Sequence, residues 1–231
     1  MTEAPYTIIR RPRRKTASIV IHSDNRIEVL APLTLTEIEI AAWVSSKQAW
    51  IRQKLHFNTH SRRPYQAKKF IPGESFSLLG ESYLLVIKAS PKACIELDDK
   101  QLIIQQPLKS CAAQQSYLRD ATMRWYQAFA HKHLNQRVAL FAQHIGKTPT
   151  LVGIKNYRSR WGSCHIDGRI YFNWRIIMAP TDIVDYVVVH ELCHLHQHNH
   201  SPAYWRLVAS IMPDYRKAKQ WLKENSLALD L

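Results

Sequence analysis

The sequence predicts an α+β protein, with a β-rich region over residues 1–108 and a mainly helical domain with a short antiparallel sheet over 109–231. The first half holds short runs of alternating polarity, broken by proline, glycine and aspartate, around one helical segment. In the second half, apolar residues recur at helical spacing, interrupted by one pair of strand-like runs. The chain has 231 residues, 46% of them hydrophobic, which is enough for one sizeable domain or two small ones.

The β-rich region begins with a predicted hairpin. The runs over residues 19–21 and 27–30 are rich in β-branched side chains and flank Asp24-Asn25, a turn-forming pair. Residues 70–105 alternate in polarity and are interrupted repeatedly, which predicts several short strands. The interruptions are Pro72-Gly73, Gly80, Ser90-Pro91 and Asp98-Asp99.

Two helices are predicted before the C-terminal third of the chain. The first covers about residues 34–58, with Thr34 or Thr36 as its N-cap and an apolar stripe along one face. The second is a long stretch over residues 110–146, where apolar side chains keep helical spacing until Gly146.

A strand pair and a buried helix follow. Residues 154–177 contain two strand-like runs joined at Asp167-Gly168, a strong hairpin signal. Thr181 or Asp182 can cap a helix after these strands, and residues 183–189 are apolar almost all round. We therefore expect a buried helix beside an antiparallel strand, an arrangement that can bind an extended peptide by strand addition.

The buried helix carries the most informative motif of the chain, His190-Glu191-Leu192-Cys193-His194. Two histidines four residues apart lie on one face of a helix, so both imidazoles can reach one ion. A catalytic zinc takes three protein ligands and leaves its fourth position to water. Glu191, beside the first histidine, can take a proton from that water, so the motif predicts a metal-dependent hydrolase.

A third histidine, His200, follows six residues after His194. Asn199 can adopt the left-handed conformation that ends a helix, and Ser201, followed by proline, has the pattern of an N-cap. His200 is therefore expected in the corner between two helices, free to fold back toward the first. We predict His190, His194 and His200 as the metal ligands and Glu191 as the catalytic base.

The sequence leaves other candidates for the third metal ligand open. His198 lies four residues after His194 and can share its face, whereas His196 is only two residues away and points elsewhere on a helix. A carboxylate from a later helix is less attractive, because Asp214 follows a proline as a helix N-cap and Glu224 lies in a polar segment near the end. The histidine-rich tract can also be a solvated loop that binds metal adventitiously.

The formal net charge of +14 favours an anionic partner such as nucleic acid or a nucleotide, and the densest basic cluster lies over residues 10–15. A solvated strand edge is the simpler explanation of that cluster. No run of about 18 apolar residues predicts a membrane span, and residues 1–15 lack the apolar core of a secretory signal. Four cysteines without a C-x-x-C pair suit reduced thiols, so we expect a cytoplasmic protein.

Several strings in the C-terminal half occur together in one known family. They are Arg160-Trp161-Gly162-Ser163-Cys164, Asn173-Trp174-Arg175, the run from Tyr186 to Leu195, and Asn199-His200-Ser201 with Trp205. In combination they resemble the YgjP-like family of predicted metal-dependent hydrolases, relatives of the SprT-like zinc metallopeptidases. The resemblance covers most of the chain and implies a zincin-like, minimal metallopeptidase domain behind a β-rich N-terminal region. It also implies His190, His194 and His200 as ligands of one Zn²⁺ per chain and Glu191 as the base.

Three functions are compatible with such a centre. The first is a zinc metallopeptidase acting on a peptide or protein. The second is a metal-dependent nucleotide phosphohydrolase of the nucleoside triphosphate pyrophosphatase type, motivated by the excess of basic residues between 110 and 180. The third is a nucleic-acid-associated module with a structural metal, which would need a fourth ligand such as His198 or Cys164.

Side chains around the centre are candidates for binding substrate or for stabilising an oxyanion. The candidate oxyanion donors are Arg158, Arg160, Tyr204 and His165. The predicted substrate-binding residues are Arg158, Arg160, Asn173, Arg175 and Tyr204.

Overall fold

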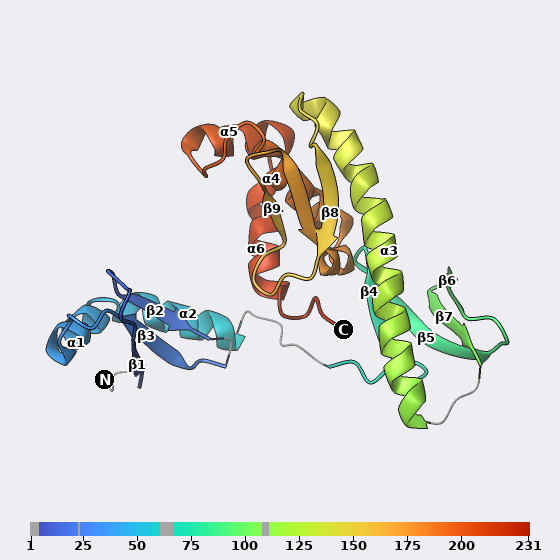
Figure 1. Ribbon diagram of the computed structural model, residues 1–231, viewed down its shortest axis with the longest axis horizontal. Coiled ribbons are helices and arrows are strands. Elements are labelled where there is room, and N and C mark those ends of the chain that lie inside the picture. The colour runs from blue at the N-terminus through green and yellow to red at the C-terminus, as the bar shows by residue number, and fades with distance from the viewer. Residues whose placement is uncertain (1–4, 23, 61–66, 108–110) are drawn as a thin grey trace. The chain divides into compact units, whose positions relative to one another are not determined.

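The computed structural model describes residues 5–22, 24–60, 67–107 and 111–231, and it confirms the predicted α+β class (Figure 1). The chain divides into two compact units, residues 1–63 and 64–231. The first is a small sheet with two helices, and the second carries the remaining sheets and helices.

The first unit confirms the predicted hairpin. Its elements are β1 (Thr7–Arg10), β2 (Ser18–Ile21), β3 (Ile27–Ala31), α1 (Glu37–Ser46) and α2 (Gln48–His60). Strands β2 and β3 pair antiparallel, Asn25 in their turn has a φ of 66°, and β1 joins β3 in parallel on the other side. The sheet order is therefore β1-β3-β2, with one strand more than the sequence predicted.

The single helix predicted over residues 34–58 is two helices that meet at Lys47. Thr36 caps α1 through a capping box, since its hydroxyl accepts from the Glu39 N–H while the Glu39 carboxylate accepts from the Thr36 N–H. Buried side chains such as Val29 and Ile40 join the helices to the sheet in one small core.

Part of the N-terminal basic cluster has a structural role. Arg10 donates from Nη1 to the Leu35 carbonyl at 2.6 Å, and Arg14 donates from Nε to the Thr16 carbonyl at 2.8 Å. These two guanidinium groups tie the strands to their loops, so the cluster is not simply a free basic surface.

The second unit begins with a four-stranded sheet of order β4-β5-β7-β6. Its strands, β4 (Ser75–Leu78), β5 (Glu81–Ala89), β6 (Cys94–Asp98) and β7 (Gln101–Gln106), confirm the short strands predicted here. The long helix α3 (Cys111–Ile145) follows and ends before Gly146, whose φ of 73° is typical of a helix C-terminus.

The first sheet of this unit packs against the C-terminal elements, so the compact units divide between residues 63 and 64 and not at the predicted boundary of 108 and 109. The Leu79 N–H donates to the Ile177 carbonyl at 2.6 Å, and a Cβ on Gly80 would lie 2.9 Å from the Cα of Pro180. Phe76 shares one buried core with side chains of α3 and the C-terminal helices. This long-range packing is not visible in the local sequence pattern.

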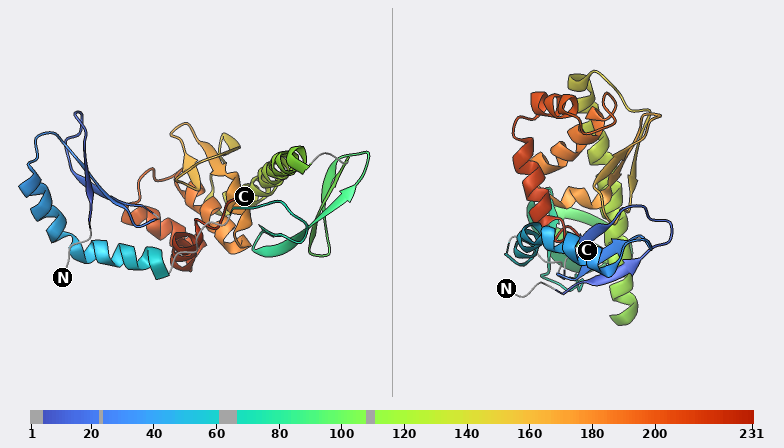
Figure 2. Two further views of the ribbon diagram at one scale, coloured as in Figure 1. Left: turned by 90° about the horizontal axis from the view of Figure 1, so that it is seen from below. Right: turned by 90° about the vertical axis from the view of Figure 1, so that its left-hand side faces the viewer.

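A second, three-stranded sheet lies beside the C-terminal helices, as the right-hand view of Figure 2 shows. Its strands are β8 (Leu151–Lys155), β9 (Gly162–Cys164) and β10 (Arg169–Asn173), in the order β8-β10-β9. The predicted hairpin is β9–β10, which pair antiparallel and turn at Gly168 with a φ of 83°. Because β8 pairs with β10 in parallel, the sheet is mixed and not purely antiparallel as predicted.

The C-terminal helices follow a short 3₁₀-helix, η1 (Trp174–Met178). They are α4 (Thr181–Cys193), α5 (Pro202–Ile211) and α6 (Tyr215–Asn225). The N-cap of α4 is Pro180, one residue before the two predicted candidates, and no side chain caps the helix. Ser201 caps α5 as predicted, and its hydroxyl accepts from the Tyr204 N–H at 3.3 Å.

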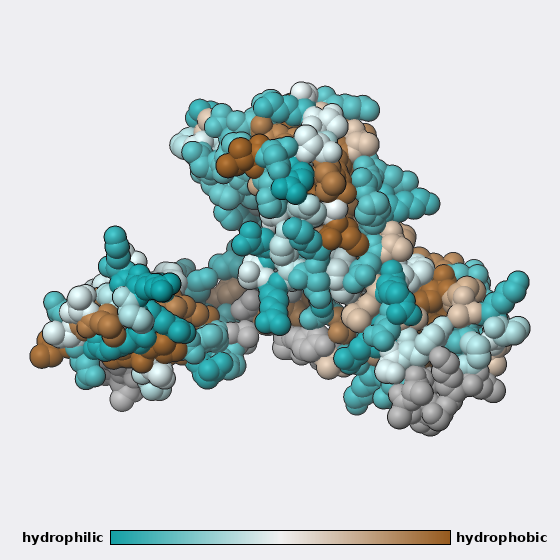
Figure 3. Space-filling model, viewed as in Figure 1, coloured by the Kyte–Doolittle hydropathy of each residue, from teal (hydrophilic) through white to brown (hydrophobic). Residues whose placement is uncertain are grey.

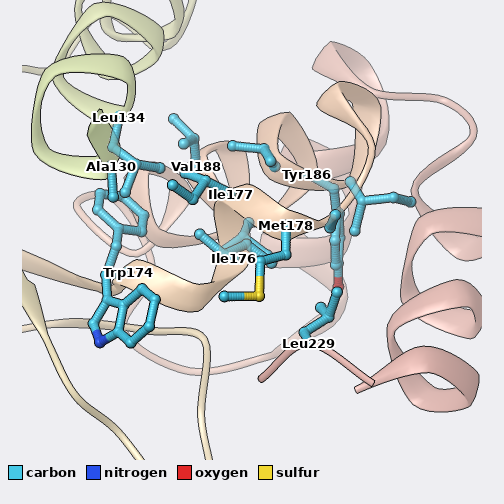
Figure 4. Close-up of a cluster of buried hydrophobic side chains, with 14 of the residues drawn as sticks. Ala130, Leu134, Trp174, Ile176, Ile177, Met178, Tyr186, Val188 and Leu229 are labelled. Carbon is cyan, nitrogen blue, oxygen red and sulfur yellow. The ribbon is translucent and has the colours of Figure 1, made fainter. Parts of the chain in front are cut away.

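Helix α4 is the centre of the main core (Figure 4). Its side chains from Ile183 to Val189 are all buried, as expected of a helix that is apolar all round. Trp174, Ile177 and Met178 of η1 pack beside it together with Leu134 of α3. The helix is thus held from several sides, which makes its C-terminal end a rigid support.

The visible surface of the second unit is mostly hydrophilic (Figure 3). Within the described residues, no helix is both long and apolar enough to cross a membrane.

An ion pair between α3 and α4 is expected to contribute strongly to stability. Arg137 donates from Nε and Nη2 to the two carboxylate oxygens of Asp185, each at 2.6 Å, and Asp185 is only 8% exposed. Arg137→Ala would leave this carboxylate unpaired, so the free energy of unfolding should fall by about 2–3 kcal/mol. Denaturant titration measures the loss. Lys217→Ala, which breaks an exposed pair with Asp214, should change stability by less than about 0.5 kcal/mol.

Candidate metal centre

The C-terminal end of α4 positions the first two histidines. The helix ends at Cys193, and His194 is its C-cap residue, with an N–H that donates to the Glu191 carbonyl at 3.2 Å. His194 keeps a right-handed helical conformation, so the expected proximity of positions four apart is preserved. The rings of His190 and His194 lie 5.0 Å apart and nearly perpendicular.

The chain then turns back and brings His200 to the same place. The Asn199 side chain accepts from the Ser201 N–H at 3.2 Å, which shapes the corner before α5. Asn199 does not end the helix as predicted, because α4 stops six residues earlier and Asn199 has no positive φ. Nε2 of His200 lies 3.1 Å from Nε2 of His190. One ligand atom from each of His190, His194 and His200 lies within 4.8 Å of the others.

The donor set fits a divalent transition metal. Two nitrogens bound to one tetrahedral zinc at ~2.0–2.1 Å are separated by ~3.3 Å, close to the 3.1 Å between His190 and His200. Nδ1 of His194 lies 2.9 Å from the Gln197 carbonyl, a contact in which the ring donates and keeps Nε2 free to bind. Nδ1 of His190 is buried and meets no hydrogen-bond partner among the described residues.

All three imidazoles are held in the neutral form that binds metals. Burial, followed by the charges of His194, His200 and Lys219, lowers the pKa of His190 to about 3. Burial also lowers the pKa of His194, against an opposing hydrogen bond to Gln197. For His200, burial and then Lys219 lower the pKa. At neutral pH the three imidazoles are therefore uncharged, and each keeps one ring nitrogen whose lone pair can bind a metal.

Aromatic side chains of α5 support this arrangement. The Tyr204 ring stacks on His194 with centroids 4.5 Å apart, and its hydroxyl donates to the His190 carbonyl at 2.9 Å. Trp205 stacks on His200, with centroids 5.5 Å apart and planes inclined by 24°. Tyr204 is fully buried. The histidines are thus fixed by packing as well as by their own backbone.

The alternative ligands lie outside the cluster. Nε2 of His196 lies 3.0 Å from the Ile145 carbonyl, which links the turn after α4 to the end of α3. His198 is exposed, and Cys164 lies on β9. Burial, with smaller contributions from Glu191 and Asp167, raises the pKa of the Cys164 thiol to about 11. Neither residue belongs to the cluster of potential ligands, so the described residues supply no fourth ligand.

Glu191 is buried beside the histidines and packs against a glycine of the neighbouring strand. Glu191 is only 5% exposed. Burial raises the pKa of its carboxyl group to about 8, while the charge of Arg160 acts in the opposite direction. A Cβ on Gly162 would lie 2.5 Å from Oε1 and 2.6 Å from Cγ of Glu191. Only glycine leaves room for this carboxylate.

Gly162 lies in one of the strings that resemble the family, but the sequence pattern alone indicates no role for it. Its φ is not positive, so nothing in the local conformation requires glycine. A glycine inside a strand often marks the close approach of another group. The position of Gly162 in a predicted strand is therefore the sequence feature that could have indicated its contact with Glu191.

Several of the predicted substrate-binding residues are already bonded to the protein itself. Arg160 lies within electrostatic range of Glu191, and Arg158 is exposed. Asn173 is 4% exposed, and its Nδ2 donates to the carbonyls of Tyr157 and Arg160 at 3.0 and 3.3 Å. This contact holds the loop before β9.

Two further predicted substrate-binding residues also have protein partners. Arg175 donates to the side chains of Asp230 and Asn156, and its guanidinium lies 4.6 Å from the centroid of the Trp174 ring. The Tyr204 hydroxyl is occupied by the His190 carbonyl. His165, a candidate oxyanion donor, packs edge-on to Tyr171 with ring centroids 5.5 Å apart.

A model of the YgjP-like family, described as a metallopeptidase domain, matches residues 15–225. The crystal structure of the metallopeptidase zymogen of Pyrococcus abyssi abylysin aligns with a TM-score of 0.36 and 18% identity, over 39% of this chain and 92% of that one. No curated protein matches.

The family match has direct consequences. It implies a divalent metal, which the three histidines can bind, and a peptide or protein as substrate, whereas a nucleic-acid partner has no support from it. Since the match spans nearly the whole chain, the chain belongs to the YgjP-like metallopeptidase family and is a metal-dependent hydrolase.

Proposed function

We propose that this protein is a zinc-dependent peptidase in which His190, His194 and His200 bind the ion and Glu191 is the general base. The observation that carries the proposal is the convergence of three neutral imidazoles beside one buried carboxylate. Three nitrogen ligands without a fourth protein ligand are typical of catalytic zinc sites, where one position stays open.

The chemistry divides between the ion and the chain. When bound, Zn²⁺ would supply a Lewis acid that polarises the scissile carbonyl and makes water acidic enough to attack near neutral pH. A Glu191 carboxylate oxygen would accept the proton from the attacking water and return it to the leaving amine. The contact with Gly162 restricts where this carboxylate can lie, and the surrounding burial excludes bulk water from it.

Strand β9 offers an edge for an extended substrate. The Trp161 carbonyl and the His165 N–H bond to β10, at 2.8 Å each, and Ser163 pairs with Tyr171. In an antiparallel pair the intervening residues, here Gly162 and Cys164, direct their N–H and C=O groups to the opposite edge. β9 is the last strand of its sheet among the described residues, so a peptide can add to this edge beside Glu191.

No observation on the described residues specifically favours the nucleotide phosphohydrolase or the nucleic-acid-associated module with a structural metal. Of the arginines predicted to bind substrate, Arg175 is already bound to Asp230 and Asn156. A closed structural site lacks its fourth ligand among the described residues. Phosphohydrolase activity is therefore the result that would contradict the proposal in the experiment below.

Purified zinc-loaded protein should cleave members of a mixture of unstructured peptides, with the products identified by mass spectrometry, and should contain about one zinc per chain. A parallel incubation with nucleoside triphosphates should release no phosphate or pyrophosphate. Phosphate release without peptide cleavage would overturn the proposal in favour of the phosphohydrolase.

Gly162→Ala is expected to displace Glu191 without removing a metal ligand. The added Cβ would lie 2.5 Å from Oε1, so the carboxylate must move, and kcat should fall by about 100-fold, the cost of a displacement near 1 Å. KM and zinc content should change little. Gly153→Ala is the matched control in the same sheet, because its Cβ would meet the Tyr171 ring at 2.9 Å instead. Equal losses in both variants would contradict a specific role for Gly162.

A further inference from the structure

A pocket with basic and aromatic walls opens between α5 and α6, beside the candidate metal centre. It has a volume of about 570 Å³ and is lined by Trp205, Tyr215, Arg216, Lys219, Gln220 and Lys223. We propose that this pocket binds an acidic side chain of the peptide substrate, an aspartate or glutamate close to the scissile bond. This inference rests on the proposed peptidase function and adds a substrate class to it.

The pocket lies next to the metal centre, because Trp205 both lines the pocket and stacks on His200. Trp205 stacks on His200 at 5.5 Å, and Tyr215 stacks on Trp205 at 5.1 Å with an interplanar angle of 16°. Nζ of Lys219 lies 4.6 Å from the centroid of the Trp205 ring. The ammonium group and His200 therefore both lie against the Trp205 ring, within the reach of roughly three residues of an extended peptide at ~3.3 Å each.

The walls carry positive charge from three basic side chains. Arg216, Lys219 and Lys223 lie three and four residues apart on α6, so they share one face of the helix. None of the six lining residues is acidic. Across the part of the chain that the structure describes, neither Arg216 nor Lys219 forms an ion pair.

The nearby acids already have partners, of which only Gln220 lines the pocket. Asp214 pairs with Lys217 at 3.0 Å, and Glu224 accepts from the Gln220 side chain at 2.5 Å. A substrate carboxylate is therefore the complementary group that the pocket lacks.

The shape favours a side chain of a peptide over a nucleic-acid backbone. The aromatic faces of Trp205 and Tyr215 can pack against the methylene groups of glutamate, while Lys219 and Arg216 meet its carboxylate. Three basic side chains line this one pocket next to the candidate metal centre. A polynucleotide instead requires a longer basic surface that follows its phosphates.

The test uses matched peptides and the zinc-loaded full chain. Quenched fluorescent peptides with either Glu or Gln at each position around one cleavable bond are compared by kcat/KM. The Glu peptide should be preferred by about five- to tenfold at the position that reaches the pocket. Lys219→Gln should remove this preference and Lys219→Glu should reverse it. Lys217→Glu, the same charge change on the same helix but outside the pocket lining, should keep it.

Binding is measured in parallel, so that the inference and the proposed function can fail separately. The anisotropy of labelled Glu and Gln peptides reports their affinity for zinc-loaded Glu191→Gln protein. Cleavage without a Lys219-dependent preference overturns the pocket assignment and leaves the peptidase standing. Absent cleavage with Lys219-dependent binding of the Glu peptide supports the pocket and overturns the peptidase, and absence of both overturns both. Tighter, Lys219-dependent binding of a single-stranded DNA oligonucleotide would also overturn the pocket assignment.

Discussion

Glu191→Gln should reduce kcat for peptide cleavage by about 10³-fold, within the range of a lost general base. The amide keeps the size of the carboxylate and its packing against Gly162, but it cannot accept a proton. Zinc content should remain near one ion per chain, because Glu191 lies outside the cluster of potential ligands. Single-turnover cleavage of one identified peptide and metal analysis of the same sample measure both effects.

A matched control separates lost chemistry from lost structure. Glu224→Gln makes the same substitution on α6, at a half-buried side chain bonded to Gln220, and it should leave kcat unchanged. If Glu191→Gln keeps more than about a tenth of wild-type kcat, the proton is accepted by another group and the proposed mechanism is wrong.

His200→Ala should weaken zinc binding by more than about 100-fold, as severely as His190→Ala. Changing groups that merely orient a ligand already costs ~10- to 100-fold in metal affinity, so removing a ligand should cost more. His200 is the informative member because it comes from the corner before α5 and not from the α4 motif. Competition with a chromophoric zinc chelator measures the dissociation constant of each variant.

The neighbouring histidines are the controls for this ligand set. His198→Ala removes an exposed imidazole outside the cluster and should leave the zinc affinity unchanged. His196→Ala removes a contact to the Ile145 carbonyl, so it should lower stability slightly but keep the metal. Loss of zinc in His198→Ala with full retention in His200→Ala would show that the third ligand is wrong.

The local features of this protein were determined by its sequence. Apolar periodicity and turn residues predicted the β2–β3 and β9–β10 hairpins, the long helix α3 and the buried helix α4. The spacing of His190 and His194 depends only on helical geometry, which acts over one turn. Ser201 also acts locally, since its hydroxyl caps the helix that begins at the next residue.

Tertiary structure decided the features that depend on residues far apart in the chain. The division at residue 63 follows from packing of Phe76 and its neighbours against the C-terminal helices, which no local pattern records. The contact between Gly162 and Glu191 joins strand β9 to helix α4, and the pocket beside His200 brings side chains of α5 and α6 together. Local sequence specifies backbone conformation through short-range sterics and hydrogen bonds, whereas these contacts arise only when buried apolar faces select one packing.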